Sequence, residues 1–486
     1  MKINPLTAID FYKADHRRQY PDGTTEIYSN FTPRTSRIPS IKGVIFFGLQ
    51  YFIKEFLIDT WNNGFFRQPK EEVVSAYKRR MDTSLGKDSV PIRHIEALHE
   101  LGYLPVKIKA LAEGTYVPIG VPCLTIVNTR PEFFWITNYL ETVMSSYLWK
   151  PITSATMAYE YKKILTHYAA KTGCEESFVQ FQAHDFSFRG MSGLQDAALS
   201  GAGHLTSFVG TDSVPAIDFL ENYYRADCEN ELIGCSVPAT EHSVMCAGGQ
   251  ENEIDTFKRL INELYPSGII SIVSDSWDYW KVITEYVPML KNDILKRTGK
   301  VVLRPDSGDP VKIICGDPNA VIGAPEYKGS VECLWETFGG TITSTGHKLL
   351  DSHIGLIYGD SITLERAEEI LRRLDEKGFC SGNIVFGIGS FTYQYQTRDT
   401  FGFAMKATSA VVNNERREIF KNPKTDNGTK KSAKGLLKIV HVNGKYILLD
   451  QQSEDEEKQG FLKEVFVDGK LLINDTLTNI RGRIND

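Results

Sequence analysis

The stretch SVPATEHS, residues 236–243, places a carboxylate and an imidazole side by side after a proline. A histidine next to a glutamate can shuttle protons, ligate a metal or take up a phosphoryl group, because the neighbouring charge holds imidazole near its physiological switching point. The same residues also suit a helix start, in which Thr240 caps the turn that carries Glu241 and His242 into an apolar run. Taken alone, the stretch favours the helix start, so the rest of the chain has to decide.

Further carboxylates each follow a short apolar run that is typical of a strand. They are Asp185, Asp212, Asp275 and Asp306. Such a ring can hold ribose hydroxyls, coordinate Mg²⁺ directly or through water, and stabilise positive charge that develops on a sugar. The alternative for each is an ordinary surface turn. Arg189 and Arg304 lie close in sequence to two of these carboxylates, either as structural ion pairs or as groups that grip phosphate and ribose.

Two glycine turns are candidates for the binding of phosphate. In GDS, residues 359–361, and in GIGS, residues 387–390, a predicted strand ends and a helix begins, with Thr363 as a further candidate cap. Backbone N–H groups at such a turn face a bound anion, although glycine turns are common. Basic residues that follow can meet a diphosphate, but a charge run is usually a solvated face. These residues are Arg398, Lys406, Lys421, Lys430 and Lys431.

Two aromatic residues can sandwich a flat heterocycle: Phe186 in the stretch HDF and Tyr12 in the stretch DFYKADH. A phenylalanine at a strand end belongs to the core more often than to a ligand site. No spacing in the sequence brings Tyr12 to Phe186.

These residues need a scaffold, and the middle of the chain predicts one. From about residue 152, helical stretches alternate with short apolar runs, which indicates parallel strands covered by helices. The runs FVQFQ, LTSFV, IISIV, KVVL, IGLIY and IVFG each lead into polar and glycine residues. Barrel and open α/β enzymes build their sites at the carboxyl ends of such strands. We therefore predict an irregular (β/α) barrel.

Both ends of the chain are rich in β-type patterns. Residues 106–129 consist of short runs cut by glycine and proline, which predicts antiparallel hairpins, and the C-terminal part repeats the pattern around Asn443-Gly444 and Asp468-Gly469. The predicted domains are residues 1–150 and 401–486, which together form a largely antiparallel β domain, and residues 151–400, which form the barrel.

Composition excludes several classes of protein. With 486 residues, two or three domains are expected, and the formal net charge of −6 offers no general attraction to nucleic acid or to an acidic membrane. The eight cysteines are scattered without a CxxC pair, which argues against zinc and for a reducing compartment. No apolar signal core and no run of roughly 18 apolar residues is present, so we expect a cytoplasmic protein without a membrane partner.

Taken together, the motifs resemble those of the nicotinamide phosphoribosyltransferases, a branch of the type II phosphoribosyltransferases. The similarity covers nearly everything from Asp10 to about Gly469. The most specific markers are DFYKADHRRQYP, WKPITSATM, AHDFSFRG, GTDSV, SVPATEHS, SIVSDSWD, LRPDSGDP, YGDSI and FGIGS followed by TRD. The resemblance implies condensation of nicotinamide with phosphoribosyl pyrophosphate to nicotinamide mononucleotide and pyrophosphate, with Mg²⁺ and with ATP as co-substrate, in a homodimer with shared sites.

The resemblance also implies a role for each candidate residue. Phe186 and the Tyr12 of a partner subunit would stack on the pyridine ring, and Asp212 would accept a hydrogen bond from the carboxamide. His242 would carry a phosphoryl group from ATP, with Glu241 orienting it. The pocket for nicotinamide would include Ser271 and Arg189. The ribose and its phosphate would be held by Arg304, Asp306, Asp275, Gly359, Asp360, Gly389 and Ser390, and the diphosphate by Arg34, Arg398, Lys406, Lys421 and Lys430. Mg²⁺ would be held mainly through the diphosphate, with Asp275 and Asp306 as candidate ligands.

Two positions depart from the family pattern, and other functions stay open. Ser390 stands in a run that is commonly glycine, and Ala404 stands where a serine often precedes the phosphate lysine. The nearest alternative is a nicotinate phosphoribosyltransferase, for which Asp212 is the discriminator, since two facing anions repel. A non-catalytic protein that binds NAD metabolites and a magnesium-dependent hydrolase of N-ribosides are the others.

Overall fold

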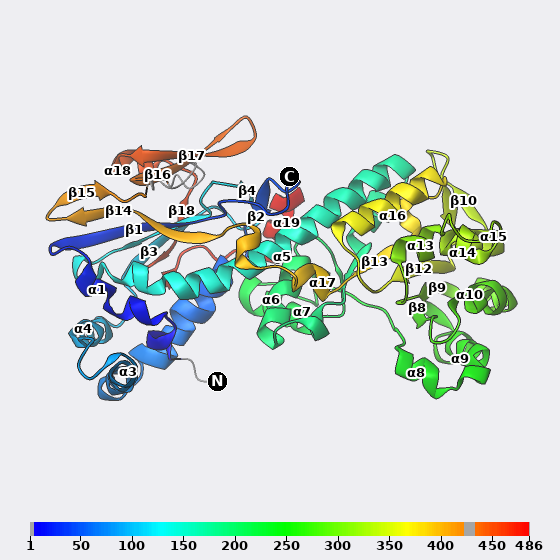
Figure 1. Ribbon diagram of the computed structural model, residues 1–486, viewed down its shortest axis with the longest axis horizontal. Helices are drawn as coiled ribbons and strands as arrows, with labels where there is room; N and C mark the ends of the chain where they lie inside the picture. Colours follow the sequence, from blue (N-terminus) through cyan, green and yellow to red (C-terminus); the bar gives the residue numbers. More distant parts are fainter. Residues whose placement is uncertain (1–3, 422–432, 486) are drawn as a thin grey trace. The chain divides into compact units, whose positions relative to one another are not determined.

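The computed structural model describes residues 4–421 and 433–485. The chain divides into two compact units. Unit 1 comprises residues 1–156, 219–226 and 396–486, and unit 2 comprises residues 157–218 and 227–395. Figure 1 shows that one unit is dominated by antiparallel strands and the other by strands wrapped in helices.

Unit 2 is built on a parallel sheet with the strand order β7-β6-β13-β12-β9-β8. All five strand pairs are parallel. The strands are β6 (Ala183–Asp185), β7 (Gly210–Thr211), β8 (Ser267–Val273), β9 (Thr298–Arg304), β12 (Ile354–Tyr358) and β13 (Val385–Ile388).

An extended segment, residues 235–239, joins the two edges of this sheet. Cys235 forms a parallel bridge with Gly210 on edge strand β7, and Ala239 forms one with Ser271 on the opposite edge strand β8. Thr211 N–H donates to the carbonyl of Cys235 at 2.9 Å, and Ser271 N–H donates to that of Pro238 at 2.9 Å. The sheet is thereby closed into a ring, and the prediction of an irregular barrel is confirmed.

Amphipathic helices cover the barrel strands. Helix α16 (Leu364–Glu376) begins at Thr363, whose side chain accepts a hydrogen bond from the N–H of Arg366 at 3.2 Å, as the sequence predicted. Its buried residues recur at helical spacing, which fixes the face turned inward. They are Ala367, Ile370, Leu371 and Leu374. Burial of each large aliphatic side chain contributes about 1.5–3 kcal/mol. Helix α13 (Pro310–Cys315) packs against α16, and helix α15 (Ser330–Phe338) packs against α13 (Figure 1).

Two predicted strands are wrong. FVQFQ lies mostly in the 3₁₀ helix η6 (Glu176–Phe181), and LTSFV is a turn after helix α6 (Leu194–His204). The strands begin only where a parallel neighbour is present, with Ala183 opposite Phe386 and Gly210 opposite His184. Tertiary pairing here overrides the apolar pattern, so each strand lies in the residues that follow the predicted run.

Unit 1 carries a seven-stranded sheet in the order β15-β14-β1-β5-β3-β18-β19. Its strands come from both ends of the chain and pair antiparallel, as predicted. They are β1 (Thr24–Thr32), β3 (Val106–Ala110), β5 (Leu124–Asn128), β14 (Ala404–Val412), β15 (Glu415–Glu418), β18 (Lys463–Val467) and β19 (Lys470–Leu471). The run between β3 and β5 is not a local hairpin: β4 (Tyr116–Pro118) pairs with β2 (Gly43–Ile45).

Both predicted C-terminal hairpins are present. Strands β16 (Leu436–Val442) and β17 (Lys445–Gln452) are joined at Asn443 and Gly444, with φ angles of 51° and 75°. The turn at Asp468 and Gly469 joins β18 to β19 with φ angles of 47° and 79°. Positive φ at both central positions is typical of the tight turn that suits twisted strands.

The division into units differs from the predicted domain ranges in one instructive way. The end of helix α7 (Val214–Tyr224) belongs to unit 1, although its sequence neighbours belong to unit 2. Tyr224 donates a hydrogen bond to Glu113 at 2.9 Å, and Lys54 Nζ donates to the carbonyl of Tyr223 at 2.7 Å. No sequence pattern marks the point at which the chain passes from unit 2 back into unit 1, because the position of the end of α7 depends on these long-range polar contacts.

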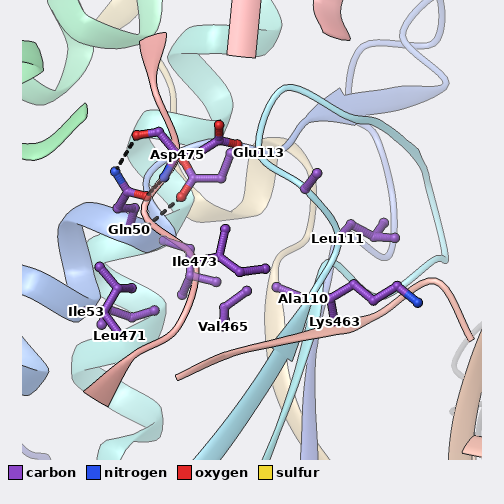
Figure 2. A pocket seen from close by; sticks show the side chains of 12 residues that line it. Gln50, Ile53, Ala110, Leu111, Glu113, Lys463, Val465, Leu471, Ile473 and Asp475 are labelled. Atoms are coloured by element: carbon purple, nitrogen blue, oxygen red, sulfur yellow. Dashed lines mark hydrogen bonds between the residues drawn. The ribbon is translucent and has the colours of Figure 1, made fainter. Parts of the chain in front are cut away.

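A small cavity of about 80 Å³ lies in unit 1 (Figure 2). The amide of Gln50 accepts from the N–H of Asp475 at 2.6 Å and donates to its carbonyl at 3.1 Å. Buried Glu113 accepts from the N–H groups of Gly48 and Gln50. A space of this size holds only a few water molecules, and these contacts hold loops together.

Candidate active site

A cavity of about 1030 Å³ opens at the carboxyl ends of the barrel strands in unit 2. Most of the residues proposed from the sequence line it. These are Phe186, Arg189, Asp212, Glu241, His242, Arg304, Asp306, Gly359, Asp360, Gly389 and Ser390. The volume matches that of pockets that enclose whole cofactors or nucleotides. The barrel therefore gathers at one mouth the residues that the sequence spreads over about 200 positions.

Asp212 lies directly after β7 and is held by two donors. His184 Nε2 and the hydroxyl of Ser236 both donate to its Oδ1, at 2.9 and 2.6 Å. Burial alone would raise the pKa of Asp212, but these bonds outweigh it and hold the pKa below its ordinary value. The carboxylate is thus ionised at neutral pH. Among the described residues no donor reaches Oδ2, which leaves this oxygen for a ligand.

Phe186 forms an aromatic wall of the same cavity. Its backbone N–H donates to the carbonyl of Ile388, which fixes the residue beside β13. The ring centroid lies 4.8 Å from that of His184 and 5.9 Å from the guanidinium carbon of Arg304. A Cβ at Gly387 would lie 2.5 Å from the ring, so glycine makes room for it. A flat ligand can stack here next to the free oxygen of Asp212.

His242 is positioned by Asp275 and not by its neighbour Glu241. His242 is the first residue of helix α8 (His242–Ala247), and its Nε2 lies 3.1 Å from Oδ1 of Asp275. The Glu241 carboxylate instead accepts from the hydroxyl of Ser243. The predicted cap at Thr240 is also wrong, because its hydroxyl accepts from the N–H of Val273 on β8 at 2.9 Å.

Asp275 itself does not line the cavity and has both oxygens in use. Its Oδ2 accepts from the N–H groups of Asp306 and Ser307 at 2.9 and 2.7 Å. Burial raises its pKa, but these bonds and His242 outweigh burial, so the pKa lies below the ordinary value. Asp275 is therefore an ionised anchor for the imidazole rather than an open metal ligand.

Asp306 has an oxygen free for a ligand. Its Oδ2 lies 3.5 Å from Arg304 Nε, while its Oδ1 is buried and has no hydrogen-bond partner among the described residues. Burial raises the pKa of Asp306, against the opposing charge of Arg304. A Cβ at Gly359 would lie only 2.3 Å from Oδ1. An unpartnered buried oxygen next to a cavity suits a ribose hydroxyl or a cation.

The two glycine turns lie on the same rim. Gly359 and Asp360 follow β12, and Ser361 has a φ angle of 56°. Gly389 is the N-cap of α17 (Ser390–Tyr393), which is only one turn long. Since so short a helix carries little dipole, an anion at Ser390 would depend on individual N–H groups and on the hydroxyl.

Several predicted residues lie in unit 1 or outside the cavity. Tyr12 is 60% exposed on the 3₁₀ helix η2 (Phe11–Asp15). Arg398 contacts the neighbouring Asp399 at 3.0 Å. Ser271 is buried on β8 and does not line the cavity. Lys430 and Lys431 lie outside the described residues, and Asp185 is fully buried beneath the site.

A group of cations gathers within unit 1. Burial lowers the pKa of Lys406, and the charges of Arg34, Lys421 and Lys13 act in the same direction against that of Glu141. The charges of these cations disfavour one another, although Glu141 already pairs with Lys13 at 2.6 Å. Arg34 Nε donates to the carbonyl of Gly402 at 3.2 Å, so this guanidinium is held in place.

Sequence reasoning missed the residues that orient the site. His184, Ser236 and Ser307 position Asp212 and Asp275, and none was singled out. His184 stands next to Asp185 in AHDF, so a signal was present, but side chains alternate along a strand and only the structure shows which faces the site. In the described part of the chain, no cluster of three or more His, Cys, Asp or Glu side chains is arranged to hold a metal.

Comparison with known proteins agrees with this geometry. Residues 181–470 match the model of the nicotinate phosphoribosyltransferase family, and residues 4–108 match that of the nicotinamide phosphoribosyltransferase N-terminal domain. A nicotinamide phosphoribosyltransferase of Acinetobacter baylyi is 61% identical, covering 99% of this chain and 97% of the relative. One of Mycoplasma pneumoniae is 36% identical, covering 89% of this chain and 95% of the relative.

Solved structures show the same fold at low identity. The nicotinate-nucleotide pyrophosphorylase of Pyrococcus furiosus has a TM-score of 0.61 at 14% identity, over 99% of this chain and 95% of that one. Human nicotinic acid phosphoribosyltransferase has a TM-score of 0.52 at 15% identity, over 98% and 92%. None of the helices described here is long and apolar enough to cross a membrane. The chain belongs to the nicotinate phosphoribosyltransferase family, and within it to the group that carries the nicotinamide phosphoribosyltransferase N-terminal domain.

Proposed function

We propose that the chain is a nicotinamide phosphoribosyltransferase, which condenses nicotinamide with 5-phosphoribosyl 1-pyrophosphate to nicotinamide mononucleotide and pyrophosphate. The observation that carries the proposal is the free Oδ2 of Asp212 beside the ring of Phe186. An ionised carboxylate accepts a hydrogen bond from a carboxamide NH₂ and repels a carboxylate. The site therefore favours nicotinamide over nicotinate.

In this reaction the residues mainly orient the two substrates and balance charge. The N1 lone pair of nicotinamide attacks C1 of the ribose while the bond from C1 to the diphosphate oxygen breaks, and the electron pair leaves with pyrophosphate. Pyridine N1 carries no proton, so no general base is required. Phe186 and Asp212 orient the ring, and Asp306 and Arg304 lie where they can hold the ribose. Cationic side chains oppose the charge of the leaving group.

Mg²⁺ would neutralise charge on the diphosphate when it is bound. The unpartnered Oδ1 of Asp306 is the candidate protein ligand, while both oxygens of Asp275 already accept hydrogen bonds. With so few open carboxylate oxygens, the diphosphate itself would supply most of the coordination.

His242 is the proposed phosphoryl acceptor from ATP. Since its Nε2–H donates to Asp275, Nδ1 carries the lone pair. Attack of Nδ1 on the terminal phosphorus of ATP would break the bond to ADP and leave a phosphohistidine. The side chain is 47% exposed, so ATP can reach it, and the ionised Asp275 stabilises the imidazole as it gains charge.

We further propose a cytoplasmic homodimer with shared sites. Tyr12 is 60% exposed and Phe11 is 49% exposed, which leaves aromatic surface for a partner subunit's cavity. The cations Arg34, Lys406 and Lys421 would face a diphosphate in the assembled site. None of the eight cysteines, all of which lie in the described part of the chain, forms a disulfide, in keeping with a reducing compartment.

The test is to supply nicotinamide or nicotinate, with phosphoribosyl pyrophosphate and Mg²⁺, and to measure the mononucleotide formed. Nicotinamide should be turned over with much the higher kcat/KM. Equal rates with the two substrates, or release of free ribose 5-phosphate, would contradict the proposal. A parallel reaction with labelled ATP should give acid-labile phosphate on the wild-type chain and none on the His242→Ala variant.

A further inference from the structure

Two free cysteines meet in unit 2, away from the cavity. Cys174 follows the last turn of helix α5 (Ile136–Thr172), and Cys380 precedes the 3₁₀ helix η11 (Ser381–Asn383), which leads into β13. The thiol of Cys174 donates to the carbonyl of Glu175 at 3.7 Å, and each of the two sulfurs acts on the pKa of the other. A Cβ at Gly382 would lie 2.8 Å from Sγ of Cys174 and 3.6 Å from that of Cys380. Both sulfurs thus border one small gap that the glycine leaves open.

The sulfur of Cys380 is surrounded by donors. The N–H of Gly382 donates to it at 3.4 Å, and the hydroxyl of Thr172 lies 3.7 Å away. The interaction with Cys174 lowers the pKa of Cys380 against the effect of burial, and the same interaction raises the pKa of Cys174. The first proton of the pair is therefore lost more easily than that of an isolated buried thiol, and Cys380 is the favoured site of the negative charge.

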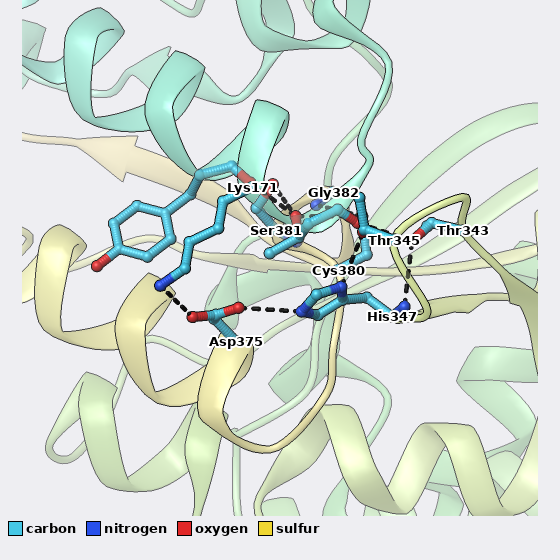
Figure 3. Close-up of polar contacts among 10 residues, drawn as sticks. Lys171, Thr343, Thr345, His347, Asp375, Cys380, Ser381 and Gly382 are labelled. Carbon is cyan, nitrogen blue, oxygen red and sulfur yellow. Dashed lines mark hydrogen bonds and ion pairs between the residues drawn. The ribbon is translucent and has the colours of Figure 1, made fainter.

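A charged network lies near Cys380 (Figure 3). Asp375 accepts from Lys171 Nζ at 2.7 Å and from His347 Nε2 at 3.0 Å, and these bonds hold its pKa below the ordinary value despite burial. His347 Nδ1 lies 2.9 Å from the hydroxyl of Thr345. The charge of His347 also lowers the pKa of Cys380. Asp375 thus holds the imidazole of His347 in place near Cys380.

The exposure of the two sulfurs differs. Cys174 is partly exposed, whereas Cys380 is buried. Cys380 has no exposed surface, so an oxidant must be small to reach it. Other buried thiols of unit 2 lack such surroundings, since burial raises the pKa of Cys315 to about 12 and that of Cys333 to about 11. A thiolate in an electropositive pocket next to a second thiol is the arrangement found in oxidisable cysteine pairs.

We propose that Cys174 and Cys380 form a peroxide-oxidisable dithiol that closes into a reversible disulfide. The Cys380 thiolate attacks one oxygen of hydrogen peroxide and becomes a sulfenic acid, and the departing hydroxide takes up a proton to leave as water. The Cys174 sulfur then attacks the sulfenic sulfur, the S–S bond forms, and a second water leaves. The two thiols lose two electrons and two protons, and the peroxide is reduced to water.

The disulfide would join the end of α5 to the start of β13. These segments are far apart in sequence, so the bond would close a long loop and restrict the unfolded chain. The pocket lies at the other end of β13, after Ile388, so the bond would stabilise the barrel without covering the site.

The experiment treats the full-length protein with hydrogen peroxide, blocks remaining thiols, and identifies cross-linked peptides by mass spectrometry. A peptide that joins Cys174 to Cys380 should appear, disappear with dithiothreitol, and accompany a rise in melting temperature of roughly 5 °C or more. The Cys315→Ser control should keep the cross-link. In Cys174→Ser, a sulfenic-acid probe that is added together with denaturant after the peroxide should label Cys380.

Two further variants test the surroundings of the sulfurs without replacing either cysteine. Gly382→Ala should slow closure because its methyl group occupies the gap between the sulfurs. His347→Gln should slow the oxidation of Cys380 several-fold at neutral pH. Absence of the cross-linked peptide from peroxide-treated wild type would overturn the proposal, and so would over-oxidation of Cys380 at equal rates in the wild type and in Cys174→Ser.

Discussion

Replacement of Asp212 by asparagine isolates the contact that we propose selects the substrate. The Oδ1 position accepts from His184 and Ser236, so an asparagine must place its oxygen there to keep both bonds. Its NH₂ group then occupies the position of Oδ2. A donor would face the NH₂ of nicotinamide where an acceptor had been, while the two supporting bonds and the local packing persist.

The expected magnitude follows from the loss of a hydrogen bond to a charged group. Such bonds contribute about 1.5–3 kcal/mol, which corresponds to a loss of roughly 10- to 150-fold in kcat/KM for nicotinamide. Because 45% of the Asp212 side chain is exposed, screening by solvent favours the lower half of that range. Nicotinate should gain, since the repulsion between two carboxylates is removed and the new NH₂ can donate to its carboxylate.

The assay measures kcat/KM for both substrates in the wild type and in Asp212→Asn, with melting temperatures as a check on folding. Ser236→Ala is the matched control, because it removes one of the two bonds to Oδ1 and keeps the charge. It should lower the nicotinamide rate by less than tenfold and leave the preference for the amide intact. An equal loss for the two substrates in Asp212→Asn would refute the assignment of Asp212 to the carboxamide.

Three other changes test separate parts of the site and the fold. His242→Ala should keep nicotinamide turnover without ATP and lose the stimulation by ATP, measured as initial rates with and without the nucleotide. Gly359→Ala places a methyl group 2.3 Å from Oδ1 of Asp306 and should raise the KM for phosphoribosyl pyrophosphate about tenfold, whereas Gly389→Ala, whose Cβ meets nothing within 4 Å, should change it little. A similar KM in the two alanine variants would contradict this reasoning. Burial raises the pKa of Glu113 from 4.5 to about 7. Between these two pH values, the carboxyl group therefore keeps its proton in the folded chain and has lost it in the unfolded chain. Unit 1 should therefore lose up to about 3 kcal/mol of stability as the pH rises from about 4.5 to about 7, and Glu113→Gln should flatten this slope in urea unfolding.

The sequence predicted the elements whose pattern is local. Strands β8, β9, β12 and β13, the cap at Thr363 and the two C-terminal hairpins are all present. Each depends on residues within a few positions of one another, as in the helical spacing of α16 or the turn at Asn443-Gly444. Barrel enzymes build their sites at the carboxyl ends of the strands, and this general rule correctly predicted that most of the candidate residues line one cavity.

What the sequence did not predict depends on contacts between distant residues. Strand β6 begins at Ala183 because β13 lies beside it, and the end of α7 belongs to unit 1 because Tyr224 reaches Glu113. The same holds within the site. Adjacency in the chain suggested Glu241 as the partner of His242, but an extended backbone directs neighbouring side chains to opposite sides. Asp275 takes that role from the loop that follows β8.

The stretch around residue 236 has a structural task that neither reading of its sequence included. It closes the barrel between β7 and β8, and its register with both edges places Ser236 against Asp212 and Thr240 against Val273. His242 follows directly after the register ends. One extended segment therefore orients the carboxylate that would recognise the amide and also carries the imidazole that would accept the phosphoryl group. A shift of this segment by one residue would turn every one of its side chains to the other face. The position of Ser236 at Asp212 and the position of His242 are therefore set together by one register.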